Sequence, residues 1–114
     1  MDYSKLSDFE INKRVALTLG FILYKNGESH RANHVAIQEG RCGAFTMDYC
    51  NNPADAWPII VANQISILYE EAIGKWNAGK AYWVDGVEWQ ITDDVMDKNP
   101  LRAAMIVFLM MQDH

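Results

Sequence analysis

The sequence predicts one α+β domain, in which an antiparallel sheet of about three to five strands packs with three helices. Three observations support this prediction: a capped amphipathic stretch near the N-terminus, two Asn-Pro dipeptides that open apolar segments, and an Asp-Gly turn between aromatic-rich runs. The helices are expected over about residues 8–19, 53–63 and 100–112. The chain has 114 residues, of which 50% are hydrophobic, so it can bury one core and is expected to form a single domain over 1–114.

The first predicted helix begins directly after Ser7. Ser7 and Glu10 have the spacing of a capping box, in which the serine side chain accepts from the backbone N–H of the glutamate. Ile11, Val15 and Leu19 then recur every four residues. This repeat gives the helix one apolar face.

The other two helices are predicted from the Asn-Pro dipeptides at 52–53 and 99–100, because asparagine is a favoured N-cap and proline fits the first turn. Pro58 should kink or restart the second helix, since it removes a backbone hydrogen bond. Residues 101–112 are apolar almost all round, which indicates a helix buried on most sides. Other helices or a second protomer must cover it, so we also expect a homodimer through this C-terminal helix.

Short strands are predicted in the remaining apolar runs. Residues 21–24 and 34–38 each lead into a turn, and residues 65–68 form a third run of this kind. The stretch 69–81 is compatible with either a strand or a helix.

The segment 83–91 has the strongest hairpin signal, because Asp85-Gly86 suits a two-residue type I′ turn. Trp83 and Trp89 flank this turn and should face each other across one face of the sheet. If a helix covers that face, the two tryptophans belong to the core. If none does, they form an exposed aromatic platform of the kind enriched at protein interfaces. We favour the core, since buried aromatic residues dominate small cores.

Charge is distributed unevenly along the chain, whose net charge is −5. Residues 1–41 contain six Lys/Arg and five Asp/Glu, whereas residues 42–114 contain four Lys/Arg and ten Asp/Glu. Binding of a nucleic-acid backbone needs clustered cations, so direct nucleic-acid binding is disfavoured. An acidic surface suits a basic partner instead.

The N-terminal residues have no cationic stretch that leads into an apolar run, so no secretion signal is expected. The longest apolar run, 103–111, is less than half of the roughly 20 residues that a membrane-spanning helix needs. We expect a cytoplasmic protein with no membrane partner. Cys42 and Cys50 are then expected to be reduced thiols.

Metal and cofactor sites are not expected. His30 and His34 have the spacing of a helical zinc site, but Arg31 stands where a metalloprotease needs glutamate, and the flanking residues indicate loop and strand. Cys42 and Cys50 lack the short paired spacing of zinc ligands, and a catalytic thiol would need a low pKa.

The groups of neighbouring acidic residues do not identify a catalytic residue either. Asp93, Asp94 and Asp97, or Glu70 and Glu71, are candidates for acid–base or magnesium chemistry, but carboxylates around turns are usually solvated. The sequence has no Gly-rich phosphate loop and no nucleophile elbow.

The segment 48–58 breaks a local rule, because a proline inside a predicted helix follows a large aromatic residue. Such inconsistencies are found more often at functional or strained sites. An architectural interpretation is also open, in which Asn52 caps the helix, Asp55 offsets the helix dipole and Trp57 fills the core. The candidate binding surface comprises Asp48, Tyr49, Cys50, Asn51, Asn52, Asp55 and Trp57, together with Trp83 and Trp89 of the hairpin.

Three segments have a recognisable sequence: YSKLSDFEINK at 3–13, DYCNNPADAWPII at 48–60 and NPLRAAMIVFLMM at 99–111. Together they resemble the NinX-like family of tailed (lambdoid) phage proteins, a family of unknown function. The resemblance implies a small phage or prophage accessory protein in the cytoplasm of a bacterial host. It implies no catalytic or ligand-binding residue.

We therefore expect a non-enzymatic protein-binding module that acts on a host or phage protein. One alternative is a small enzyme or modifier that uses Asp48, Cys50, Asn52 and Asp55. A third hypothesis is an indirect role in phage nucleic-acid transactions, which rests on the genes that usually surround members of this family.

Overall fold

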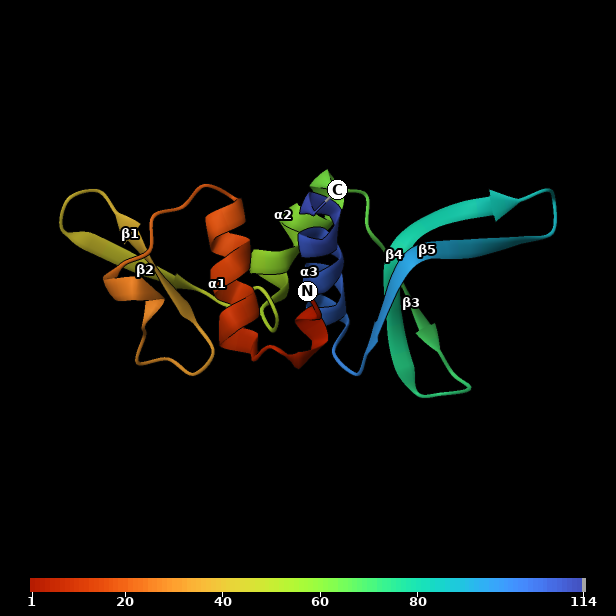
Figure 1. Ribbon diagram of the computed structural model, residues 1–114, viewed down its shortest axis with the longest axis horizontal. Helices are drawn as coiled ribbons and strands as arrows, with labels where there is room; N and C mark the ends of the chain where they lie inside the picture. Colours follow the sequence, from red (N-terminus) through yellow and green to blue (C-terminus); the bar gives the residue numbers. More distant parts are fainter. Residues whose placement is uncertain (114) are drawn as a thin grey trace.

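The structure is a computed structural model that describes residues 1–113, and it places three helices between two antiparallel sheets (Figure 1). The helices are α1 (Asp8–Thr18), α2 (Pro53–Ala62) and α3 (Pro100–Gln112), and two 3-10 turns are η1 (Tyr3–Lys5) and η2 (Lys25–Gly27). The smaller sheet pairs β1 (Val35–Glu39) with β2 (Gly43–Met47), and the larger has the order β3 (Ser66–Glu70), β4 (Lys75–Val84), β5 (Glu88–Asp97). The predicted α+β class is confirmed, with the strands divided between two sheets.

Helix α3 lies at the centre of the fold. The larger sheet packs against one side of it, and α1 and α2 pack against other sides, while the smaller sheet contacts α1 (Figure 1). Every residue from Ala103 to Leu109 is buried. The apolar pattern of this helix is therefore explained within one copy of the chain, and no second protomer is needed to cover it.

Each helix begins at the position that was predicted from its capping residue. The Ser7 hydroxyl accepts from the backbone N–H of Glu10 at 3.1 Å, as the capping box requires. The side chain of Asn52 accepts from the N–H of Ala54, and that of Asn99 from the N–H groups of the first turn of α3. Each helix agrees with its predicted range to within one residue.

The predicted restart of the second helix at Pro58 is wrong, because α2 runs through Pro58 without interruption. Pro58 has no backbone N–H, so the carbonyl oxygen of Ala54 lacks its usual helical donor. Both residues lie on the exposed side of the helix, where water can donate to that oxygen. On the opposite side, Ile59 and Ile60 are buried and hold the following turn against the core.

Two of the predicted strands form largely as expected, at β1 and β3. Residues 21–24 form no regular strand. The backbone of Leu23 makes an isolated bridge to Ile37, so this segment lies beside β1. The ambiguous stretch 69–81 belongs to β3, β4 and the turn between them. Within residues 1–113, no helix is both long enough and apolar enough to cross a membrane.

The distal half of the β4–β5 hairpin projects away from the helices (Figure 1). Pairing with β3 ends at Gly79, and the register of β4 and β5 shifts between Ala78 and Lys80. Beyond this irregularity, residues 80–92 continue as a two-stranded ribbon, which we call the arm. Its loop has three residues, 85–87, one more than predicted, since Val84 and Glu88 are the last pair. The arm makes the molecule long, with extents of 55 × 26 × 24 Å.

Candidate functional site

The turn that precedes α2 is fastened to α1 by buried side chains. The carboxylate of Asp48 accepts from Asn12 Nδ2 at 2.8 Å and from Asn51 Nδ2 at 3.0 Å. Asn12 is fully buried, and its Oδ1 accepts from the N–H of Cys50 at 3.0 Å. The backbone N–H of Asp48 donates to the carboxylate of Asp55 at 2.9 Å. These bonds satisfy polar groups that would be costly to bury alone.

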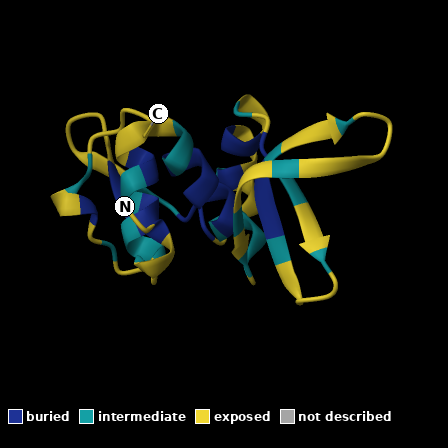
Figure 2. Cartoon of the chain, turned by 45° about the vertical axis from the view of Figure 1, so that its right-hand side comes forward, coloured by how far each residue is buried: buried dark blue, intermediate teal, exposed yellow. Residues whose placement is uncertain are grey.

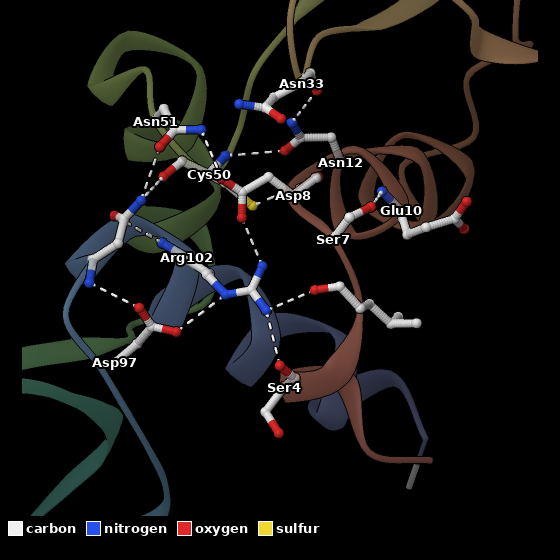
Figure 3. A network of polar contacts seen from close by, with 12 residues as sticks. Ser4, Ser7, Asp8, Glu10, Asn12, Asn33, Cys50, Asn51, Asp97 and Arg102 are labelled. Atoms are coloured by element: carbon white, nitrogen blue, oxygen red, sulfur yellow. Dashed lines mark hydrogen bonds and ion pairs between the residues drawn. The ribbon is translucent and has the colours of Figure 1, made fainter.

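A second cluster surrounds the guanidinium of Arg102 at the start of α3 (Figure 3). Arg102 Nη1 lies 2.6 Å from Asp8 Oδ1, and Nε lies 3.1 Å from Asp97 Oδ2. Its Nη2 donates to the backbone oxygens of Ser4 and Leu6 at 3.1 and 2.8 Å. The side chain is only 13% exposed, so each of its nitrogens has a protein acceptor where water is scarce.

The turn before α2 and the Arg102 cluster meet through Asn99 and Asn51, and Figure 3 labels Asn51 beside Cys50. Asn99 Nδ2 donates to the backbone oxygen of Cys50 at 2.8 Å and to Asn51 Oδ1 at 2.9 Å. Asn51 Nδ2 donates in turn to Asp8 Oδ2 at 3.1 Å. The segments 3–13, 48–60 and 99–111 therefore converge on one network. The arrangement supports an architectural role for these residues.

Cys50 is chemically protected within this network. Its side chain is buried, and burial, with a further contribution from the Asp8 carboxylate, raises the pKa of the thiol well above its ordinary value. The thiol is therefore protonated at neutral pH and is a poor nucleophile. Cys42 lies exposed in the turn between β1 and β2, and both cysteines are free. An enzyme that uses Cys50 is not supported by this environment.

The remaining candidate ligands are dispersed. His34 Nε2 lies 3.8 Å from Asp48 Oδ2, while His30 is exposed on the preceding loop. Asp97 is engaged by Arg102. Among residues 1–113, no group of three His, Cys, Asp or Glu side chains is placed to hold a metal ion.

An apolar groove of about 370 Å³ lies beside the turn, between α2 and the segment that follows α1. We call it the α2 groove. Tyr49 lies in its lining, fully buried, and its hydroxyl has no hydrogen-bond partner among the described residues. Burial, together with the nearby carboxylate of Asp55, raises the pKa of Tyr49 to about 12. The walls include Leu19, Phe21, Met47, Pro58 and Ala62.

Trp57 does not fill the core, so that part of the architectural interpretation is wrong. The residue is 61% exposed on the outer side of α2, and Val61, one turn further on, is 55% exposed. Ala56, Ile59 and Ile60 occupy the buried side instead. Helix α2 is apolar on both sides, so its sequence does not indicate which side turns inward.

Trp83 and Trp89 pair across the arm as predicted, with their ring centroids 5.3 Å apart. The favoured prediction that they belong to the core is wrong, because they are 50% and 64% exposed. Figure 2 shows that most of the projecting part of the hairpin is exposed. The arm leaves α3 before it reaches them, and within residues 1–113 no helix covers this face (Figure 1). Trp89 and Ile91 share a shallow hollow with Leu68 of β3, so the exposed aromatic pair continues onto the body of the sheet.

The structure brings together only part of the candidate surface. Residues 48–55 gather at the network, whereas Trp83 and Trp89 lie on the arm, beyond α3 (Figure 1). The residues that organise the network were not among the candidates: Asp8, Asn12, Asn99 and Arg102. One signal was present, since Arg102 is the single charged residue in the apolar run 101–112.

Residues 2–112 match the family described as "Bacteriophage P22, NinX". No curated protein and no solved structure matches the chain. The matched range includes every helix and strand of the fold, and it therefore covers the arm as well as the network.

Proposed function

The chain belongs to the bacteriophage P22 NinX family, and from that premise we propose that this phage accessory protein is a non-enzymatic binding module for a host or phage protein. It acts in the cytoplasm of the bacterial host. The observation that supports this function is the exposed pair of Trp83 and Trp89 on the arm.

Two exposed tryptophans in contact are a costly surface for a free protein. A large aromatic side chain presents ~150–250 Å² when fully exposed, so these two half-exposed rings together offer roughly 200 Å² that a partner can cover. Tryptophan is also among the residues that contribute most to binding energy at interfaces. The two rings contact each other across the strand pair, and this contact lowers the conformational entropy that they lose when a partner covers them.

The charges of the arm indicate what kind of protein would cover it. Asp85 lies in the loop of the arm, Glu88 accepts from Gln90 on the face opposite the tryptophan pair, and Asp93 and Asp94 follow at the base of the arm, so the arm as a whole is acidic. Lys80 is the one cation between residues 80 and 92, and its Nζ is engaged by the backbone oxygen of Asn63 at 2.6 Å. The expected partner is a protein with an apolar pocket edged by Lys or Arg. Bases could stack on the tryptophans, but these carboxylates oppose a phosphate backbone.

The enzyme alternative has less support. The carboxylates of Asp48 and Asp55 are engaged in holding the turn, and the Cys50 thiol is buried and protonated. Asn52 is occupied as the N-cap of α2. These four residues therefore build the scaffold and leave little free chemistry for a substrate.

The proposal is tested by affinity capture from host lysate, with and without phage infection, followed by direct binding measurements with the purified partner. Wild-type protein is compared with the double variant Trp83→Ala/Trp89→Ala and with Trp57→Ala, which removes an equally exposed tryptophan elsewhere. We expect the double variant to weaken binding at least about 30-fold, as for interface hot spots, and Trp57→Ala to bind the partner directly as wild type does. Affinity should also fall with added salt.

Equal binding of the partner by the folded double variant would contradict the role of the arm. Turnover of a nucleotide, nucleic acid or peptide substrate at a rate that depends on Asp48 or Cys50 would contradict a non-enzymatic function. Circular dichroism of each variant checks that it is folded.

A further inference from the structure

Helix α2 turns an uncharged apolar side toward solvent. Trp57 and Val61 are one turn apart and form an exposed ridge along the helix. Ala54, Pro58 and Ala62 form the neighbouring row, which is one wall of the α2 groove. The outward side of a surface helix is normally polar. The only charged residue of α2 is Asp55, whose carboxylate is engaged by the backbone of the preceding turn.

This side of α2 contains both a projecting side chain and a hollow. Trp57 projects directly beside Pro58, and the groove next to it measures about 370 Å³, which is enough for a large aromatic side chain. Leu19 and Phe21 form the opposite wall, and Phe21 is held by an edge-to-face contact with Phe45 at 6.1 Å. A surface with a projection and a matching hollow side by side is complementary to a rotated copy of itself, as a two-fold dimer requires.

We propose that two copies of the chain associate about a two-fold axis at α2, with Trp57 of one protomer in the α2 groove of its partner. The exposed ridge of each helix then packs beside the row of small residues on the other helix, the usual way in which two helices meet. This dimer differs from the one expected through the C-terminal helix, since α3 is covered within the chain.

Charge favours a second copy as the occupant of the groove. Each protomer has a net charge of −5, so two copies repel wherever acidic surfaces meet, as they would at the arm. The ridge has no charge, and Asp55 is the one charged residue in the groove lining, where its carboxylate accepts from the backbone N–H of Asp48. The ridge and the groove allow identical copies to approach where repulsion is weakest.

The available area is consistent with a modest interface. Trp57, Val61 and the two wall residues Leu19 and Phe21 are each between 38% and 61% exposed. With large side chains that present ~200 Å² each, they offer on the order of 400 Å² of apolar surface, about half of what each partner of a standard interface buries. The helix backbone, Ala54, Pro58 and Ala62 would contribute part of the remainder. A dimer that forms at micromolar concentrations is expected.

The proposed dimer goes beyond the proposed function, because it leaves the arms of both protomers free to bind a partner. Two arms that bind the same assembly would raise the effective concentration of the second arm.

The experiment is sedimentation equilibrium of the purified full chain over a range of micromolar concentrations. Wild type should approach twice the monomer mass of 13.0 kDa. Trp57→Ala removes the projecting side chain, and Ala62→Glu adds a carboxylate at the wall of the groove; both positions are exposed, so both variants should fold. Each should raise the dimer dissociation constant at least about tenfold. Trp83→Ala/Trp89→Ala should leave it unchanged.

A wild-type protein that stays monomeric throughout this range would overturn the proposal. So would a dimer that survives both α2 variants, or one that only the arm variant dissociates. Partner binding and dimerisation are measured separately on the same three variants, so a failure of one proposal is distinguishable from a failure of the other. Far-ultraviolet circular dichroism and thermal melting confirm that each variant is folded.

Discussion

Arg102 and Asp8 form an ion pair of 2.6 Å that joins the first turn of α3 to the first turn of α1, across 94 positions of sequence. The same guanidinium also holds Asp97, where β5 ends. One side chain therefore fixes the positions of a helix, a strand and the N-terminal segment. Its removal would leave two carboxylates partly buried without their cation.

We predict that Arg102→Ala lowers the free energy of unfolding by about 3 kcal/mol, since a buried charge network that loses one partner is strongly destabilised. Arg102→Lys should recover only part of this loss, because an ammonium cannot reproduce the planar fork of donors. Urea denaturation measures both. The exposed Lys98→Ala serves as the control and should change stability by less than about 0.5 kcal/mol. A loss below 1 kcal/mol for Arg102→Ala would show that the network contributes little.

The two cysteines should differ sharply in reactivity. Cys42 is exposed, whereas Cys50 is buried with a raised thiol pKa. A thiol reagent at pH 8 should therefore label one cysteine rapidly in the native protein and the second only after unfolding. The Cys42→Ser variant should show almost no rapid labelling. Fast reaction in that variant would mean that the turn before α2 opens readily.

Tyr49 should make the fold sensitive to alkaline pH. Because its pKa is raised from the ordinary 10 to about 12, the fold favours the neutral phenol. This contribution to stability is complete below pH 10 and is lost as the pH rises toward 12, by about 1.4 kcal/mol per pH unit. Tyr49→Phe should remove this part of the pH dependence.

At pH 7, Tyr49→Phe should be neutral or stabilising, by up to ~1 kcal/mol, because the buried hydroxyl has no partner among the described residues. The measurement is urea denaturation at several pH values between 7 and 12. Tyr82→Phe, at an exposed position, is the matched control and should follow the wild-type curve. If both variants lose stability in parallel with wild type, Tyr49 is not the group that titrates.

Gly79 is placed to set the direction of the arm. A Cβ at this position would overlap the side chain of Ile91 and lie 2.6 Å from the backbone oxygen of Thr92. We expect Gly79→Ala to cost about 1–3 kcal/mol of stability, as overpacking does. In the double variant Gly79→Ala/Ile91→Ala, the part of the destabilisation that comes from overlap with the Ile91 side chain should disappear. A double-mutant cycle measures this part. Strict additivity of the two changes would argue against this contact.

The helices were predictable because their signals are local. Ser7, Asn52 and Asn99 each cap a helix within three residues of themselves, so neighbouring sequence is enough to place the start. The pairing of Trp83 with Trp89 depends on the three-residue loop 85–87, because the predicted two-residue turn would have paired Trp83 with Glu88.

Exposure was not predictable in the same way, because it depends on what lies above a residue in space. The arm tryptophans have a sequence pattern that suits a core, and only the departure of the arm from α3 exposes them. The partners of Arg102 were also hidden, because Asp8 is almost a whole chain length away. A lone charge in an apolar helix predicts that a partner exists, but it does not identify that partner.

The pairing of α1 with α3 also determines when the chain can fold during its synthesis. At roughly 5–20 residues per second, a ribosome needs about 5–20 s to advance from Asp8 to Arg102. Throughout that interval Ile11 and Val15, which are fully buried in the finished protein, lack the helix that covers them. The apolar side of α1 is therefore covered only after α3 has been synthesised.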